Sequence, residues 1–148
     1  MELFRASTFL RRVLIADAVT CAATGLLLML GDDLLERLLG LPSGLSRYAG
    51  ISLLPFAAFL VYLATRENLS QRMVWAVIIL NVLWTVDSIL ILLIGWAAPT
   101  ELGYTFVIVQ ALGVAMFAAL EYIGLRGQWS EQGSVAGERR PGGGAGIV

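Results

Sequence analysis

The sequence predicts an all-α membrane protein, a four-helix transmembrane bundle with both termini in the cytoplasm. Three observations lead to this expectation: an apolar composition, four apolar runs of bilayer length, and an uneven placement of arginine. Of the 148 residues, 58% are hydrophobic and 14% are charged, and the mean hydropathy is +0.81. Soluble domains are roughly half apolar and a quarter charged. Because so short a chain has little interior in which to hide apolar side chains, a lipid bilayer is the expected surrounding of its surface.

Four apolar runs come close to the ~20 residues that a helix needs to cross a bilayer. Glycine and proline residues fall between the runs, where they are expected to end helices. Residues 1–127 are therefore expected to form one transmembrane domain. Its spans are 13–30, 48–65, 73–98 and 102–125.

Three segments lie outside these runs. The first connection, "GDDLLERLLGLPSGLSR", alternates leucine and charge at helical spacing, so we expect a short amphipathic helix on the outer surface. The N-terminal "MELFRASTFLRR" is also amphipathic and is expected to extend the first helix. Residues 128–148 are rich in glycine and lack periodicity, which predicts a disordered cytoplasmic tail.

The arginines indicate the orientation. The chain has no lysine, and with a cytoplasmic N-terminus only Arg37 and Arg47 lie outside. Cytoplasmic flanks carry an excess of basic residues, so the pattern predicts a multi-pass protein of the cell inner membrane. The inside arginines would be Arg5, Arg11, Arg12, Arg66, Arg72, Arg126, Arg139 and Arg140.

Several kinds of chemistry are absent from the sequence. The chain has no histidine and one cysteine, Cys21, which leaves no histidine metal site, haem ligand pair, imidazole proton shuttle or intrachain disulfide. It also has no phosphate-binding glycine loop, no zinc-protease motif and no nucleophile elbow. We predict no catalytic residues, metal, cofactor or nucleic acid, and an enzyme is the least favoured class.

The third run carries polar residues at mid-membrane depth. A charged aspartate at a helix centre costs roughly 2.5 to 3.5 kcal/mol on insertion scales. Asp87 must therefore face protein or water, and its carboxyl group is expected to be protonated or hydrogen-bonded. We expect it to point into the bundle or a small wet cavity. A function and a structural role are weighed equally for it. The residues expected on this polar face are Asn81, Trp84, Thr85, Asp87 and Ser88.

A second polar group joins the first and fourth runs. Asp17 and Glu121 are expected about one turn inside the inner interface, close enough for Arg11, Arg12 and Arg126 to reach them. An interfacial ion pair that fixes register is favoured over a functional role. Gln110 is expected deeper in the fourth run.

Small residues recur at every fourth position of two runs, a spacing that lets membrane helices approach closely. We expect the first and fourth helices to touch through these stripes, with contact to another subunit as the alternative. The helix-packing residues are Ala16, Thr20 and Thr24 on one helix and Ala111, Ala115 and Ala119 on the other.

In "ILNVLWTVDSILIL" and "FAALEYIGLR" the chain resembles the short four-span inner-membrane proteins of bacteria. This is a likeness of type and implies no activity. A carboxyl group in the first of four spans, here Asp17, is also similar to the small multidrug exporters, whose coupling carboxylate lies there. The glycine-rich third helix and aromatic-lined first helix of that family are not evident in this chain, so no activity is carried over.

Two function classes remain. The first is a non-catalytic membrane protein that packs with itself or with a membrane-protein partner, indicated by the small-residue stripes and short loops. The alternative is a proton-coupled carrier or small-ligand binder that uses the intramembrane carboxyl groups.

Overall fold

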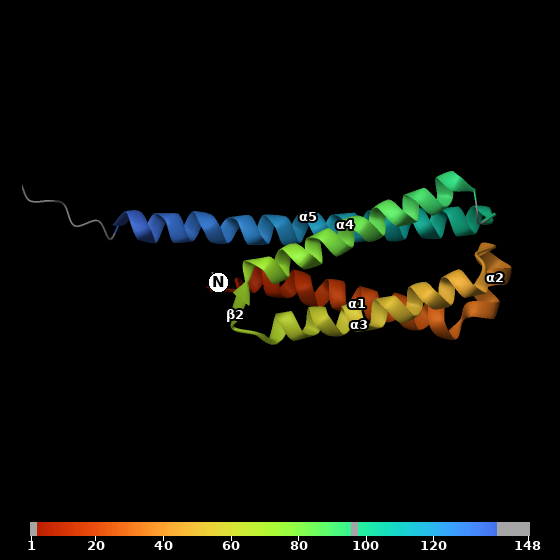
Figure 1. Ribbon diagram of the computed structural model, residues 1–148, viewed down its shortest axis with the longest axis horizontal. Helices are drawn as coiled ribbons and strands as arrows, with labels where there is room; N and C mark the ends of the chain where they lie inside the picture. The colour runs from red at the N-terminus through yellow and green to blue at the C-terminus, as the bar shows by residue number, and fades with distance from the viewer. Residues whose placement is uncertain (1–2, 96–97, 139–148) are drawn as a thin grey trace, which may run out of the picture.

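The computed structural model describes residues 3–95 and 98–138. Four long helices lie side by side along the longest axis of the molecule (Figure 1), and each is long and apolar enough to cross a membrane. By length and composition the chain is a small multi-pass membrane protein, as the sequence predicted. The elements in order are β1 (Leu3–Arg5), α1 (Thr8–Leu30), α2 (Asp32–Leu39), α3 (Ser43–Thr65), β2 (Asn68–Ser70), α4 (Gln71–Ile94) and α5 (Glu101–Glu138).

The first two long helices begin five residues before the apolar runs that predicted them. Helix α1 begins at Thr8, because the Ser7 hydroxyl caps its first turn by accepting a hydrogen bond from the Leu10 N–H at 3.1 Å. Helix α3 begins at Ser43, directly after Pro42. The first turns of both helices contain polar residues, so the apolar runs predict starts that are too late.

The four long helices form two antiparallel pairs. Helix α1 packs along α3, and α4 packs along α5, whereas the pairs meet each other mainly through α1 and α5 (Figure 1). The α1–α3 contact is closest at Gly25 and Gly50, where a Cβ atom on Gly50 would lie 2.7 Å from the Gly25 carbonyl oxygen. The backbones therefore touch at this crossing.

The expected packing of α1 on α5 through small-residue stripes is not what the structure shows. Ala16 is exposed, and Ala111 and Ala115 line the α4 side of α5 together with Thr85. The reason is that glycine permits closer approach than alanine or threonine, so the packing face of α1 is centred on Gly25. Of the remaining stripe residues, Thr20 and Thr24 are half-buried and Ala119 is exposed.

A two-stranded ribbon joins the helices at one end of the molecule, called here the ribbon end. Strand β1 pairs antiparallel with β2, with Phe4 opposite Leu69. The N-terminal segment was expected to extend α1, and it does so from Thr8 onward, whereas Leu3–Arg5 pair with β2. The Ala6 N–H donates to the Glu67 carbonyl at 3.2 Å.

The opposite end, called the α2 end, carries the amphipathic helix that the sequence predicted. Helix α2 ends at Gly40, whose φ of 66° is a left-handed conformation that glycine adopts without strain. Thr100 joins α2 to the start of α5: its N–H donates to the Leu39 carbonyl at 2.8 Å, and its hydroxyl donates to the Leu38 carbonyl at 2.7 Å.

Helix α5 continues ten residues beyond Gln128, to Glu138, where the sequence predicted disorder. Extending an existing helix avoids the cost of nucleation, so the segment needs no apolar period to be helical. The Gln128 amide, oriented with its nitrogen toward the Arg5 carbonyl at 2.7 Å and its oxygen toward the Ser7 N–H at 2.8 Å, joins α5 to the N-terminal segment. The rest of the predicted tail, 139–148, lies outside the described residues.

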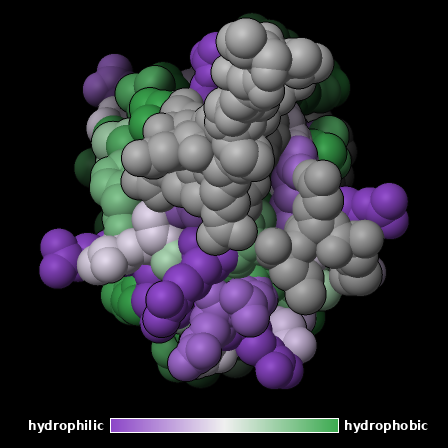
Figure 2. All heavy atoms as spheres, turned by 90° about the vertical axis from the view of Figure 1, so that its left-hand side faces the viewer, coloured by the Kyte–Doolittle hydropathy of each residue, from purple (hydrophilic) through white to green (hydrophobic). Residues whose placement is uncertain are grey.

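The flanks and the ribbon end of the molecule expose side chains of different hydropathy. Viewed from the ribbon end, hydrophilic side chains gather on the end face and hydrophobic ones surround it (Figure 2). On the flanks large apolar side chains face outward, for example Val19 at 63% exposure and Leu112 at 66%. This distribution suits a protein whose flanks contact lipid and whose end contacts water.

We expect Gly50→Ala to lower the free energy of unfolding by about 1–3 kcal/mol, because the added methyl group meets backbone atoms that cannot move aside. Denaturation with sodium dodecyl sulfate in mixed micelles, followed by circular dichroism, measures the change. Gly113→Ala is the matched control: nothing lies within 4 Å of the added atom, so stability should hold or rise. Equal effects at the two glycines would show that the α1–α3 crossing is not a close contact.

Candidate functional site

Three helices converge on one side-chain amide in the interior. Asp17 of α1 and Glu121 of α5 are 0% exposed, and Asn81 of α4 is 1% exposed. Asn81 Nδ2 donates to Asp17 Oδ2 at 2.9 Å and to Glu121 Oε2 at 3.1 Å. We call Asp17, Asn81 and Glu121 the carboxyl–amide cluster.

The two carboxyl groups of the cluster lie close together, because both accept a hydrogen bond from the same Asn81 nitrogen. Two ionised carboxylates held this close in an apolar interior repel each other, so we expect at least one of the two to hold a proton. The Cys21 thiol donates to Asp17 Oδ1 at 3.4 Å, whereas Glu121 Oε1 is buried without a partner among the described residues. In that same part of the chain, no arginine neutralises either carboxyl group. An amide, a thiol and a proton therefore stabilise the two carboxyl groups of the cluster.

The cluster lies deeper in the bundle than the interfacial ion pair that the sequence predicted. Asp17 is nine residues into α1, about 14 Å from its start at 1.5 Å per residue, and Asn81 is ten residues into α4. The sequence placed Asp17 near the interface because it took the span to begin at Val13, more than a turn too late. Arg11, expected to reach Asp17, instead donates from Nη2 to the Arg66 carbonyl at 3.2 Å.

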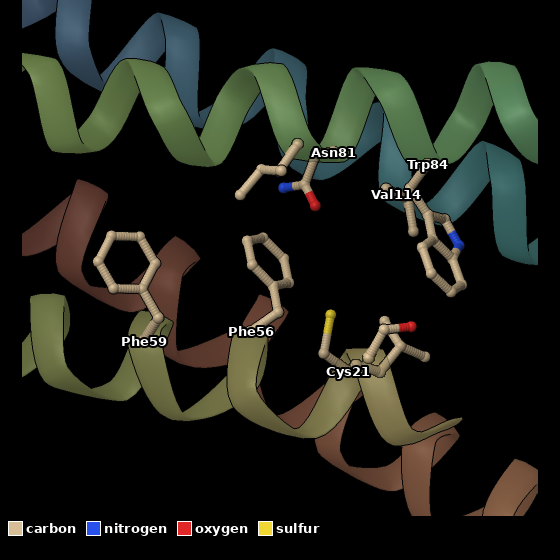
Figure 3. A pocket seen from close by; sticks show the side chains of 9 residues that line it. Cys21, Phe56, Phe59, Asn81, Trp84 and Val114 are labelled. Atoms are coloured by element: carbon tan, nitrogen blue, oxygen red, sulfur yellow. The ribbon is translucent and has the colours of Figure 1, made fainter. Parts of the chain in front are cut away.

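Beside the cluster, between the two helix pairs, lies a cavity of about 380 Å³, called here the central cavity. Figure 3 shows Asn81 on one wall and Cys21 opposite, with Phe56 and Phe59 from α3 and Trp84 from α4 around the space. Asn81 and Cys21 are the residues that both line the cavity and bond to Asp17. The side chains of Asn81 and Cys21 thus separate the carboxyl groups from the cavity. The remaining lining residues are Ser52, Leu53, Leu80 and Val114.

Asp87 does not join Asn81 as expected. It is exposed and lies on the wall of a second cavity of about 240 Å³, called the α2-end cavity, together with Trp84, Ser88 and Gln110. The reason is geometric: six residues at about 100° each place Asp87 roughly 120° around α4 from Asn81. The Thr85 hydroxyl lies 3.0 Å from the Asn81 carbonyl of its own helix and 3.5 Å from the Ala111 carbonyl of α5.

Sequence reasoning paired Asp17 with Glu121 but assigned Asn81 to a separate site. It also missed Cys21 as a partner of Asp17, and it missed Phe56 and Phe59. The missed signal was the spacing of Asp17, Cys21 and Gly25, one helical turn apart on the buried face of α1. The described residues contain no group of three or more acidic, cysteine or histidine side chains that could hold a metal ion.

Buried carboxyl groups between apolar helices define a class: a small multi-pass membrane protein with acidic groups enclosed between its helices. Comparison of the chain with protein-family models, with curated proteins and with solved structures found no match.

Replacing Asn81 with leucine should lower the free energy of unfolding by about 3 kcal/mol, because two buried carboxyl groups lose their shared donor. The matched control is Ser88→Ala on the same helix, which removes a hydroxyl bonded only to the Trp84 carbonyl and should cost less than about 1 kcal/mol. The same mixed-micelle titration measures both. A loss at Asn81 no larger than at Ser88 would refute the bridging role of the amide.

Proposed function

We propose that the protein binds a small lipophilic cation in the central cavity and exchanges it against the proton of the carboxyl–amide cluster. One observation carries this proposal: Asp17 and Glu121 share the buried Asn81 amide without a basic partner among the described residues, next to a cavity with aromatic walls. No catalytic step is part of the proposal.

The charge of the cluster supports a cationic ligand. A carboxyl pair that shares one proton carries a net negative charge, and in an apolar surrounding it attracts either a second proton or another cation. A unit positive charge about 6 Å away would gain roughly 3 kcal/mol at an effective dielectric constant of about 20. Entry of a cation would therefore favour loss of the shared proton.

The walls of the cavity support the same class of ligand. Phe56, Phe59 and Trp84 offer ring faces, which attract cations by about 2 kcal/mol or more when water is excluded. Leu53, Leu80 and Val114 complete an apolar lining that would exclude a hydrated inorganic ion. The ligand would thus combine a positive charge with an apolar body.

We expect benzyltrimethylammonium to bind the purified protein and to release protons into a weakly buffered solution, because its fixed charge competes with the shared proton. Calorimetry with a pH indicator measures binding and release together. The double variant Asp17→Asn/Glu121→Gln keeps the shape of the cluster but removes titration, so proton release should vanish and affinity should fall at least tenfold.

Neopentylbenzene, which replaces the ammonium nitrogen with carbon, is the matched uncharged control and should bind at least tenfold more weakly. Equal affinity for the two compounds would show an apolar site without charge recognition. Cation binding without proton release would show that the cluster is not coupled to the cavity.

The arrangement of arginines leads us to propose that the ribbon end faces the cytoplasm of a cell with an inner membrane. Arg5, Arg66 and Arg72 belong to segments at this end, whereas Arg37 and Arg47 belong to segments at the α2 end. Both termini would then be cytoplasmic, because α1 begins and the last span ends at the ribbon end.

Alkaline phosphatase fused after Arg126 should be inactive, since the enzyme folds only outside the cytoplasm, and a fusion within 32–47 should be active. Enzyme activity in whole cells, normalised to fusion protein, provides the measurement. The opposite pattern would reverse the orientation and would leave the cavity argument unchanged.

A second candidate function is association with another copy or with a membrane-protein partner. It is favoured by the outward position of Ala16, a small residue that would let another helix approach α1 closely. Native mass spectrometry would test it, since a monomer under gentle conditions would remove this candidate.

A further inference from the structure

The α2-end cavity contains three buried polar atoms without a hydrogen-bond partner among the described residues: Ser46 Oγ, Trp84 Nε1 and Gln110 Nε2. Ser46 is 2% exposed. The indole N–H and the amide nitrogen can only donate, and the hydroxyl can donate as well. Buried donors in folded proteins are nearly always satisfied by protein, water or a ligand, so three in one cavity indicate a site for a molecule that supplies acceptors.

The charge of this cavity restricts the ligand further. Asp87 lines it and no arginine does, so an anionic headgroup or a free fatty acid would be repelled. The remaining walls are apolar, with Leu28, Ile91 and Phe106 among them. The cavity thus suits an uncharged, lipophilic molecule with hydrogen-bond acceptors.

The three donors lie at a depth that an uncharged lipophilic molecule in the bilayer could reach. Ser46 is three residues into α3 and Gln110 is nine residues into α5, so they lie about 5 Å and 14 Å from the α2 ends of their helices. The exposed side chain of Tyr48, at 81%, forms part of the rim. A molecule lying in the adjacent half of the bilayer could therefore enter from the flank.

We propose that the α2-end cavity binds the carbonyl group of an uncharged lipophilic molecule, with Ser46, Trp84 and Gln110 as donors. The carbonyl group has two natural sources: the acyl ester of a lipid and the ring of a quinone. Both present acceptor oxygens on an apolar body. With an ester ligand, Asp87 would accept a hydrogen bond from a free glycerol hydroxyl.

This inference is independent of cation binding in the central cavity. The two cavities share Ser52 and Trp84. Of these two cavities, Ser46 and Gln110 line the α2-end cavity and not the central one, whereas Asn81 lines the central one and not the α2-end cavity. Variants at Ser46 and Gln110 therefore test the carbonyl site. The variant Asp17→Asn/Glu121→Gln should leave carbonyl binding unchanged.

The test uses the full chain in an alkyl maltoside detergent, which has no carbonyl group. Phenylalanine replaces Trp75, Trp96 and Trp129, so that the remaining fluorescence comes from Trp84. Dioctanoylglycerol and a decyl-substituted benzoquinone are titrated as the two sources. Dioctylglycerol ether, which lacks the carbonyl groups, is the matched control for the ester, and decylbenzene is that for the quinone.

We expect a saturable change in Trp84 emission with at least one of the two carbonyl compounds, and the compound that saturates identifies the source. Its carbonyl-free control should bind at least tenfold more weakly. Gln110→Leu and Ser46→Ala should each weaken binding about five- to tenfold, as the loss of one hydrogen bond predicts. Thr105→Val, which removes an exposed hydroxyl bonded within α5, should have no effect.

Three results would overturn the proposal: no saturation with either compound, equal binding of the carbonyl-free controls, or unchanged affinity in both Gln110→Leu and Ser46→Ala. Circular dichroism of each variant verifies folding. If Gln110→Leu fails to fold, the smaller change Ser46→Ala decides alone.

Discussion

The hydrogen bonds of Asn81 are the interaction on which the arrangement of the helices depends. Its Nδ2 atom joins a carboxyl group of α1 to one of α5, and Asn81 itself belongs to α4, so one amide joins both helix pairs. In an apolar interior no water is at hand to replace the amide as the hydrogen-bond donor to either carboxyl group. Separating the pairs at this depth would leave two acidic groups unsatisfied, which fixes the register of three helices at once.

The cavities follow from how each pair packs internally. Helices α1 and α3 approach backbone to backbone at Gly25 and Gly50, and α4 packs along α5, with the Thr85 hydroxyl 3.5 Å from the Ala111 carbonyl. Between the pairs, by contrast, large side chains such as Phe56 and Trp84 face one another and do not fill the space. Polar groups and empty volume therefore occur together along the same interface, which is the physical basis for placing both ligand sites there.

The number and type of the long helices could be predicted from composition, because bilayer length and apolarity leave few alternatives. The amphipathic α2 was predicted for a similar reason, since its leucines and charges repeat at helical spacing. The polar contacts could not be predicted in full, because they depend on where each helix starts and on which residues share a face. A start at Thr8 in place of Val13 moves Asp17 from the interface to mid-depth, and a rotation of about 120° separates Asp87 from Asn81. Hydropathy shows neither quantity, although the angle between Asp87 and Asn81 follows from their spacing of six residues on one helix.

The two helix pairs are joined at both ends of the molecule. At the ribbon end, Gln128 binds the segment that leads into α1, and at the α2 end Thr100 binds the last turn of α2. A rocking motion that opened one end and closed the other would have to break one of these junctions. Movement of the cavity walls beside the carboxyl–amide cluster, with the Asn81–Asp17 hydrogen bond intact, would break neither junction. Guest molecules would then exchange sideways with the hydrocarbon phase, and the thickness and fluidity of the surrounding bilayer would govern how fast they come and go.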